Sequence, residues 1–343
     1  MTEIISYRAV ALQTDCRAIA SCGTTEAART QIAAGSDRIA RQVAACLAWT
    51  GPDTRLVVLP EYVLTGFPTH ETPEAWIARA CLSEGCTEYE ALGAIAERHR
   101  IFLAGNAYET DPSFPGIFFQ TSFIVDPAGA VVLRYRRLNS MFSPTPHDVW
   151  DRYLDRYGLD GVFPVARTEI GRLAAVASEE ILYPEVARCL AMRGAEVVVH
   201  STCEVASPRL TPKGIARRAR ALENLVYVVS CNTAAVTGID LPEASADGGS
   251  MIVDFRGQVL AEAGQGESVV AHAELDLAAL RRFRRRPGME NLLARQRFEA
   301  YAESYRTHSH HPANTLAEGF VGRSRFLDAQ KAVIERLARD GVI

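Results

Sequence analysis

A run of small apolar residues, 174–177, stops abruptly at Ser178, Glu179 and Glu180, and a helix signal with Pro184 in its first turn follows. The apolar run predicts a buried strand. A polar residue at the end of such a strand, at a sharp turn into a helix, is held at the rim of a sheet, as in turns that expose a nucleophile. The residue at position 178 therefore decides whether this chain can act as a hydrolase.

A carboxylate and a cation follow two other strand patterns. Residues 56–59 form a short apolar run that ends at Pro60, and Glu61 comes next. We expect Glu61 to project from this strand end into a cleft, and an exposed loop position is the alternative. Arg137 follows the strand pattern of residues 131–135.

Strand patterns alternate with helical patterns along the chain. The expected strands are residues 7–12, 56–59, 101–105, 121–125, 131–135, 173–177, 196–200, 226–230, 251–254 and 258–261. The expected helices are residues 24–49, 88–100, 184–193, 211–224, 289–305 and 323–339. The two halves share the order strand, helix, strand, helix, hairpin, which predicts an α/β fold of two packed sheets with helices outside.

Composition limits the class of protein. The chain has 343 residues, of which 48% are hydrophobic and 23% charged, and its formal net charge is −4. This acidic balance gives no electrostatic reason to expect nucleic acid or an anionic membrane as a partner. No apolar run reaches the length of a membrane helix. Eight scattered cysteines without a C-x-x-C pair indicate reduced thiols and a cytoplasmic location.

Three segments together resemble motifs of the nitrilase superfamily of carbon–nitrogen hydrolases. Residues 57–68 are similar to the glutamate motif of that family, residues 133–139 to its lysine motif and residues 171–188 to its cysteine motif. Further matches follow in the expected order at residues 193–196, 220–224, 232 and 249–254. The resemblance covers residues 6–280 and implies a four-layer αββα sandwich that assembles into homodimers or higher homo-oligomers.

The resemblance also implies a reaction. The expected activity is hydrolysis of a non-peptide C–N bond in a small molecule, of the amide, nitrile or carbamoyl type, through an acyl-enzyme. In the family a cysteine thiolate attacks the carbon, a glutamate moves the protons and a lysine ammonium stabilises the developing negative charge. Glu61 falls at the glutamate position, Arg137 at the lysine position and Ser178 at the cysteine position. No cofactor or metal is expected.

Two of these positions depart from the family pattern. Arg137 keeps the positive charge, but its guanidinium stays protonated and forms a planar fork, so it can hold an oxyanion or simply pair with Glu61. Ser178 carries an alcohol, which is far less acidic than a thiol and harder for Glu61 to deprotonate.

Three explanations for the altered triad stay open. The chain is a working enzyme, a degenerate member that binds a small molecule or a partner without turnover, or a variant in which serine replaces a native cysteine by engineering. Engineering would not account for Arg137, nor for Asn139, which stands where the family often has histidine. Natural divergence is therefore favoured.

Four more residues are candidates for binding substrate or supporting the site. Asp148 either orients Arg137 through a bidentate pair or is a helix cap or a surface acid. Glu179 and Glu180 follow the turn at position 178, and Glu180 is expected to accept backbone N–H bonds. Cys203 is either a displaced nucleophile or, more simply, a cysteine of the pocket wall.

The chain is expected to divide into a carbon–nitrogen hydrolase-like domain, residues 1–280, and a helical C-terminal extension, residues 281–343. The basic run 281–286 is read as a solvated helix end or as a partner for acidic groups of a second subunit. The extension is interpreted as an oligomerisation arm. Its histidine cluster, residues 308–311, is expected to be solvated or at an interface instead of binding metal.

Overall fold

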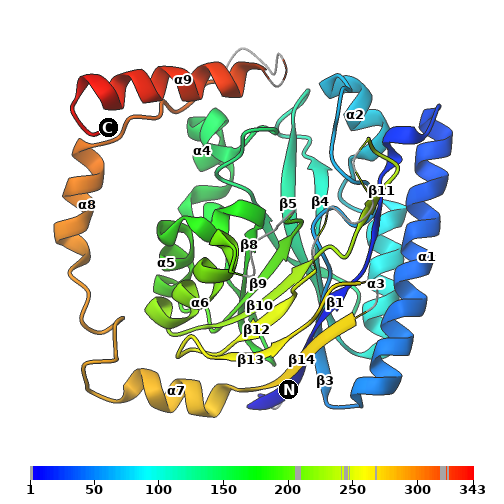
Figure 1. The fold of residues 1–343 in the computed structure, drawn as a ribbon, viewed down its shortest axis with the longest axis horizontal. Coiled ribbons are helices and arrows are strands. Elements are labelled where there is room, and N and C mark those ends of the chain that lie inside the picture. Colours follow the sequence, from blue (N-terminus) through cyan, green and yellow to red (C-terminus); the bar gives the residue numbers. More distant parts are fainter. Residues whose placement is uncertain are drawn as a thin grey trace.

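The computed structural model describes residues 3–204, 210–240, 242, 246, 248–266, 269–316, 322 and 324–343. Two six-stranded sheets lie face to face, and helices cover the outer face of each (Figure 1). The predicted αββα sandwich is confirmed.

The first sheet has the strand order β14-β1-β3-β4-β5-β6. Its strands are β1 (Ser6–Gln13), β3 (Thr54–Val58), β4 (Phe102–Thr110), β5 (Phe118–Val125), β6 (Val131–Arg136) and β14 (Val269–Asp276). The second sheet has the order β13-β12-β10-β9-β8-β7. Its strands are β7 (Ala166–Thr168), β8 (Gly171–Ala177), β9 (Val197–Thr202), β10 (Tyr227–Asn232), β12 (Met251–Val253) and β13 (Val259–Glu262). The short strands β2 (Cys16–Arg17) and β11 (Val236–Thr237) pair separately.

Helices form the outer layers. Those beside the first sheet are α1 (Thr25–Thr50), α2 (Pro73–Ala80) and α3 (Thr87–His99). Helices α5 (Pro184–Met192) and α6 (Pro212–Asn224) cover the second sheet, and α4 (Trp150–Val162) packs at the edge of the sandwich against β6. The side chains of Thr24, Thr72 and Thr211 cap the first turns of α1, α2 and α6, because each hydroxyl accepts a hydrogen bond from an otherwise unpaired backbone N–H.

Each central strand is buried on both faces. Along β1, Ala9 and Ala11 belong to the core between the sheets, whereas Val10 and Leu12 pack in the core beneath α1 and α3. Successive side chains of a strand point to opposite faces, so both sets must be apolar in a four-layer fold. This requirement explains why the sequence shows continuous apolar runs at these strands.

The chain departs from the expected elements at several places: helices α2, α4 and α7 (Leu277–Arg285) and strand β7 were not expected, and two further departures have a clear physical reason or consequence. Residues 289–297 do not continue the expected helix, which begins only at α8 (Phe298–Thr307). Asn291 explains the interruption, because its amide donates to the carbonyls of Arg284 and Arg286 at 2.7 and 3.1 Å, bonds that compete with helix formation. Strand β14 was not expected, and it completes the first sheet by pairing antiparallel with β1.

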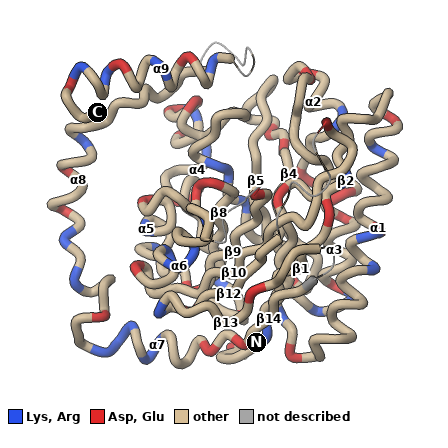
Figure 2. The backbone as a smooth tube through the Cα atoms, in the orientation of Figure 1, with Lys and Arg blue, Asp and Glu red and all other residues tan. Residues whose placement is uncertain are grey.

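The C-terminal helices run around the edge of the sandwich (Figure 1). Helix α7 (Leu277–Arg285) is anchored within the chain, since Arg281 pairs with Glu196 at 2.6 Å. Helix α8 has no buried residue, and α9 (Ser324–Arg339) buries only Phe326 among its described residues. Figure 2 shows basic residues gathered along α7 and both charge signs along α8 and α9. Within the described ranges, no helix combines the length and apolarity needed to cross a membrane.

Candidate active site

Glu61, Arg137 and Ser178 come together although they are far apart in the sequence. Glu61 lies just beyond β3 in the first sheet, Arg137 directly follows β6, and Ser178 directly follows β8 in the second sheet. Side chains at the carboxyl ends of parallel strands meet at one edge of the fold. All three residues are buried, with exposed fractions of 0%, 4% and 4%.

The Glu61 carboxylate is held by several donors. Its Oε1 accepts a hydrogen bond from Gln120 Nε2 at 2.5 Å, and its Oε2 accepts one from the backbone N–H of Cys203 at 2.8 Å. Ser178 also favours the ionised form of this carboxylate. Burial raises the pKa of Glu61, and the charges of Arg137 and Lys213 offset only part of this effect. Glu61 is therefore a stronger base than a solvated carboxylate.

Arg137 is surrounded by acceptors. Its Nη1 donates to Gln120 Oε1 at 2.6 Å and lies 3.7 Å from Glu61 Oε1, and its Nε donates to the Asn139 carbonyl at 2.8 Å. Its Nη2 pairs with Glu179. Burial opposes the charge of Arg137, but Glu179, Glu61 and Glu180 outweigh burial and raise its pKa. The guanidinium is thus a permanent cation that neighbouring carboxylates neutralise.

Ser178 sits on a strained turn. Its φ is +49°, in the left-handed region that non-glycine residues rarely adopt. It opens a short 3₁₀ segment, Ser178–Leu182, whose carbonyls of Ile181 and Leu182 accept hydrogen bonds from Arg220 of α6 at 2.9 and 3.0 Å. Strain of this kind persists where surrounding contacts enforce it, and it clusters at functional sites.

A lysine that the sequence analysis missed also enters the site. Lys213 belongs to the first turn of α6, and its Nζ lies 3.5 Å from Ser178 Oγ and 3.0 Å from Thr202 Oγ1. Its charge also favours the ionised form of Glu61. No motif surrounds it in the sequence; the signal that could have drawn attention to it is the rarity of lysine in this chain, which has only Lys213 and Lys331.

The carbon–nitrogen hydrolase family description matches residues 18–285. The chain belongs to this family. The resemblance to the nitrilase superfamily, inferred from the motifs, is therefore confirmed.

Several named proteins and solved structures are similar to this chain. The omega-amidase NIT3 of Saccharomyces cerevisiae is 27% identical over 254 residues, which are 74% of this chain and 84% of that protein. A formamidase of Pseudomonas syringae is 29% identical over 71% of this chain and 66% of its own length, and an (R)-stereoselective amidase of Pseudomonas is 32% identical over 70% and 79%. The crystal structure of yeast Nit3 has a TM-score of 0.65 at 22% identity, covering 82% of this chain and 94% of that chain.

In this member of the carbon–nitrogen hydrolase family, Glu180 supports the turns around the site. Its Oε1 accepts the backbone N–H groups of Leu138 and Asn139, both at 2.8 Å, and its Oε2 accepts the Tyr135 hydroxyl at 2.8 Å. Burial raises the pKa of Glu180 to about 7.

Asp148 caps a short helical turn together with Thr145. Its Oδ2 accepts the backbone N–H and the hydroxyl of Thr145 at 2.9 and 2.6 Å, and Thr315 donates to its Oδ1. The pairing with Arg137 that the sequence suggested is therefore replaced by the alternative role, a cap. The physical reason is local: Thr145 and Asp148 form a reciprocal capping box at the start of a 3₁₀ turn.

Cys203 touches Glu61 through its backbone. Its side chain is half-buried, and desolvation of the thiol, followed by the negative charge of Glu61, raises its pKa to about 12. A thiol in this state does not supply the thiolate that nucleophilic attack requires. The raised pKa therefore argues against Cys203 as a displaced nucleophile.

His200 is a satisfied buried residue. Its Nε2 bonds to the Ser178 carbonyl at 2.7 Å and its Nδ1 to the Ser230 hydroxyl at 2.8 Å. Burial, followed by the charge of Arg217, lowers its pKa well below the usual range. Its contact is with the backbone of residue 178, so it positions the turn instead of taking the hydroxyl proton.

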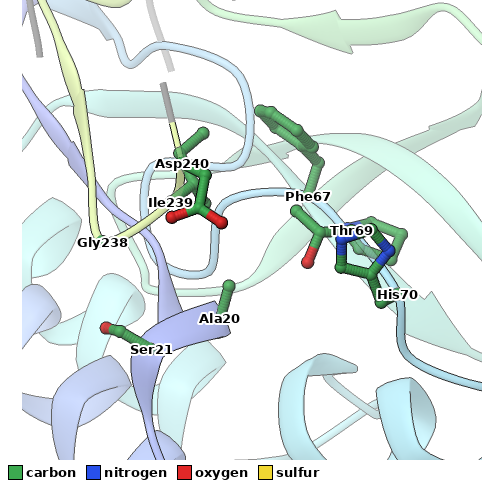
Figure 3. A pocket seen from close by; sticks show the side chains of 9 residues that line it. Ala20, Ser21, Phe67, Thr69, His70, Gly238, Ile239 and Asp240 are labelled. Carbon is green, nitrogen blue, oxygen red and sulfur yellow. The ribbon is translucent and has the colours of Figure 1, made fainter. Parts of the chain in front are cut away.

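A pocket of about 730 Å³ opens beside residues 67–70, and Glu61, Arg137 and Ser178 are not among the residues that line it (Figure 3). Phe67 lines it, and the Phe67 ring packs edge-on against Tyr62, whose centroid is 5.6 Å away and which directly follows Glu61. The polar side chains of Thr69, His70 and Asp240 line the same space. The volume is suited to a small molecule.

Proposed function

We propose that this chain hydrolyses a small-molecule, non-peptide C–N bond of the amide, nitrile or carbamoyl type, with Ser178 as nucleophile and Glu61 as general base. Family membership and the relatives named as amidases and formamidases support the reaction class. The observation that carries the proposal is the convergence of the buried Glu61 and Ser178 at one edge of the fold, where Ser178 helps to favour the ionised form of Glu61.

For an amide, the reaction proceeds in two stages. Glu61 takes the proton of Ser178 Oγ as Oγ bonds to the carbonyl carbon, and it then protonates the nitrogen as the C–N bond breaks and ammonia or an amine leaves. Glu61 next takes a proton from water, whose oxygen attacks the ester on Ser178. The carboxylic acid leaves, and Ser178 Oγ regains its proton.

Arg137 acts on Glu61 in this scheme. Its charge favours the ionised carboxylate, and Gln120 bridges the two groups by donating to Glu61 and accepting from Arg137. Arg137 therefore keeps the base charged and oriented between turnovers.

Binding without turnover is the second candidate. It is favoured by the alcohol at position 178 and by the commitment of Arg137 to Glu179, Gln120 and Asn139. In that case the pocket beside Phe67 would hold a ligand that is not cleaved.

Turnover of a panel of small amides, nitriles and carbamoyl compounds separates the two candidates. We expect the wild-type chain to release ammonia or an amine, and Ser178→Ala to reduce kcat by at least about 1,000-fold, as for other lost nucleophiles. Ser36→Ala, at a buried serine of α1, is the matched control and should retain wild-type rates.

The double variant Ser178→Cys with Arg137→Lys supplies the opposite test. If only this variant turns over a substrate while the wild type is inert, the natural chain has lost the chemistry and the binding function stands. If the wild type is active and Ser178→Ala is inert, the serine is the nucleophile.

We also propose that residues 1–280 form the catalytic domain and that residues 281–343 form an arm that packs on a second copy in a homo-oligomer. The exposed Tyr301 and Tyr305 of α8 and the exposed Leu327 and Ile334 of α9 support this role, because such apolar surfaces are typical of interfaces. All eight cysteines are free thiols, which supports a reducing compartment such as the cytoplasm.

A further inference from the structure

Lys213 occupies a position that helix stability does not explain. It lies directly after Pro212 in the first turn of α6, which contains no acidic residue. The N-terminal end of a helix carries partial positive charge, so a cation there is electrostatically unfavourable. Its ammonium instead reaches the hydroxyls of Ser178 and Thr202 at 3.5 and 3.0 Å.

The composition of the chain gives a second, independent observation. Of its 37 lysine and arginine residues, only Lys213 and Lys331 are lysines. Lys331 lies on exposed α9 and pairs loosely with Asp328 at 3.5 Å. In a chain that uses arginine almost everywhere else, one of two lysines is placed beside Ser178. A compact ammonium on a flexible stem fits a small reacting centre better than a planar guanidinium.

Arg137, which stands at the family's lysine position, is committed elsewhere. Its nitrogens point to Gln120, Asn139, Glu61 and Glu179, so two carboxylates offset its charge. Within the described residues, Lys213 Nζ instead donates to hydroxyl oxygens, those of Ser178 and Thr202. Among the described cations, Lys213 is the one within hydrogen-bonding distance of Ser178 Oγ.

We propose that Lys213 is a catalytic residue that has taken over the role of the ammonium in this site, donating to Ser178 Oγ and stabilising the negative charge that develops as the hydroxyl proton moves to Glu61. The proposal rests on the hydrolase function proposed above. The proton passes from Oγ to the Glu61 carboxylate while Oγ bonds to the substrate carbon, and Lys213 keeps its own protons throughout. Its α6 anchor is rigid, since Arg217 pairs with Glu204 at 3.1 Å and Arg220 bonds to the turn after Ser178.

Kinetics of Lys213 variants test the role in turnover. We expect Lys213→Met to reduce kcat by about 100-fold to 1,000-fold, the range for a lost charge-stabilising donor, with a much smaller change in KM. Lys213→Arg should recover part of the rate because it restores a cation. Lys331→Met, the matched control at the other lysine, should match the wild type. A Lys213→Met variant within about threefold of wild-type kcat would overturn the proposal.

A second measurement does not depend on amide turnover. The thiol introduced by Ser178→Cys is titrated by its rate of alkylation with iodoacetamide against pH, followed by mass spectrometry of its peptide. Adding Lys213→Met should raise the pKa of that thiol by about one unit or more, because a nearby cation stabilises a thiolate. Adding Lys331→Met should not shift it.

The two measurements separate the two proposals. A pKa shift with no detectable turnover in the wild type supports Lys213 as the cation at Ser178 while the hydrolase function fails. An unchanged thiol pKa overturns the assignment of Lys213, whether or not the chain hydrolyses amides. Circular dichroism of each variant verifies that the fold is retained.

Discussion

The carboxylate of Glu61 is held between opposing influences. Burial favours its protonated form, whereas Arg137, Lys213, Ser178 and Gln120 favour its ionised form. The net result is a raised pKa of Glu61, so its carboxylate is a stronger base than a solvated one. Gln120 matters here because its amide donates to Glu61 and accepts from Arg137, which fixes the spacing of the two charges.

This balance predicts the pH dependence of the reaction. Because Glu61 must be ionised to take a proton, kcat/KM should rise with pH through its pKa, and the acid limb should lie above that of a solvated carboxyl. Arg137→Gln removes a cation that lowers the pKa of Glu61, so the limb should move to higher pH, on the order of one unit. A pH profile of kcat/KM measures both positions.

The matched control is Arg134→Gln. Arg134 pairs with Glu109 at 2.7 Å and not with Glu61. The acid limb of kcat/KM for Arg134→Gln should therefore coincide with that of the wild type. A limb of Arg137→Gln that stays in place, or moves to lower pH, would show that another group controls the rate.

The sequence predicted the residues that follow strand ends, and it missed the one that starts a helix. Glu61 and Ser178 could be predicted from the sequence because each follows an apolar run, and the end of such a run is visible in the local sequence. Lys213 could not be placed in this way, because its approach to Ser178 depends on how α6 packs against the second sheet. Asp148 was assigned more than one role, and the structure distinguishes them through its local capping box with Thr145 and through the hydroxyl of Thr315, which donates to it from far along the chain.

At the scale of elements, Glu180 joins two turns that belong to different sheets. It lies in the 3₁₀ segment after β8, and it accepts the backbone N–H groups of Leu138 and Asn139 after β6. Tyr135 of β6 donates to its second oxygen. The distance between the segment that carries Arg137 and the segment that carries Ser178 is therefore set by one carboxyl group.

Because the pKa of Glu180 is raised to about 7 in the folded chain from 4.5, it links stability to pH. Folding favours the protonated form of Glu180. The contribution of Glu180 to the free energy of unfolding is therefore fully present below about pH 4.5 and is lost as pH rises through about 7. Glu180→Gln cannot ionise. Relative to this variant, the wild type should lose up to about 3 kcal/mol of unfolding free energy between pH 5 and pH 8.

Urea unfolding of both proteins at several pH values measures this difference. Glu61 is present in both, so its own titration cancels in the comparison. A gap between the two proteins that does not change with pH, or that widens in favour of the wild type at high pH, would contradict the prediction.

Elements buried on both faces could be predicted, and elements at the margins could not. Strands β3, β8 and β9 are continuous apolar runs because layers cover both of their faces. Strand β14 alternates alanine with His272 and Glu274, a pattern that gives little apolar signal, and its place depends on pairing with β1. The break at residues 289–297 depends on side-chain bonds of Asn291 that helix propensity does not include.

For the whole molecule, the sandwich and its C-terminal segment differ in how they are held. The sheets share a continuous core, whereas α8 buries no residue and, in the described part of the segment after it, Leu316 packs in the cluster beside α4. Tyr305 also donates to Glu185 of α5 at 2.8 Å. A segment with so few contacts of its own is suited to hold a second copy.

Substitutions on the exposed faces of this segment test the proposed arm. Tyr301→Asp combined with Ile334→Asp adds charge to exposed apolar positions of α8 and α9 and should weaken self-association by about tenfold or more, since truncating interface anchors has effects of that size. Sedimentation velocity over a range of concentrations gives the measurement. Val132→Asp, at an exposed position of β6, is the control and should sediment as the wild type; a double variant that does so as well would refute the arm.

The positive φ of Ser178 also limits which amino acids can take its place. Threonine offers the same hydroxyl, but its branched Cβ is a poor fit to a left-handed backbone. Serine and cysteine share an unbranched Cβ, so oxygen and sulfur can be exchanged at this corner without rebuilding the turn. The backbone conformation at position 178 therefore accommodates a hydroxyl from serine or a thiol from cysteine. It disfavours threonine, although the hydroxyl of threonine could perform the same chemistry.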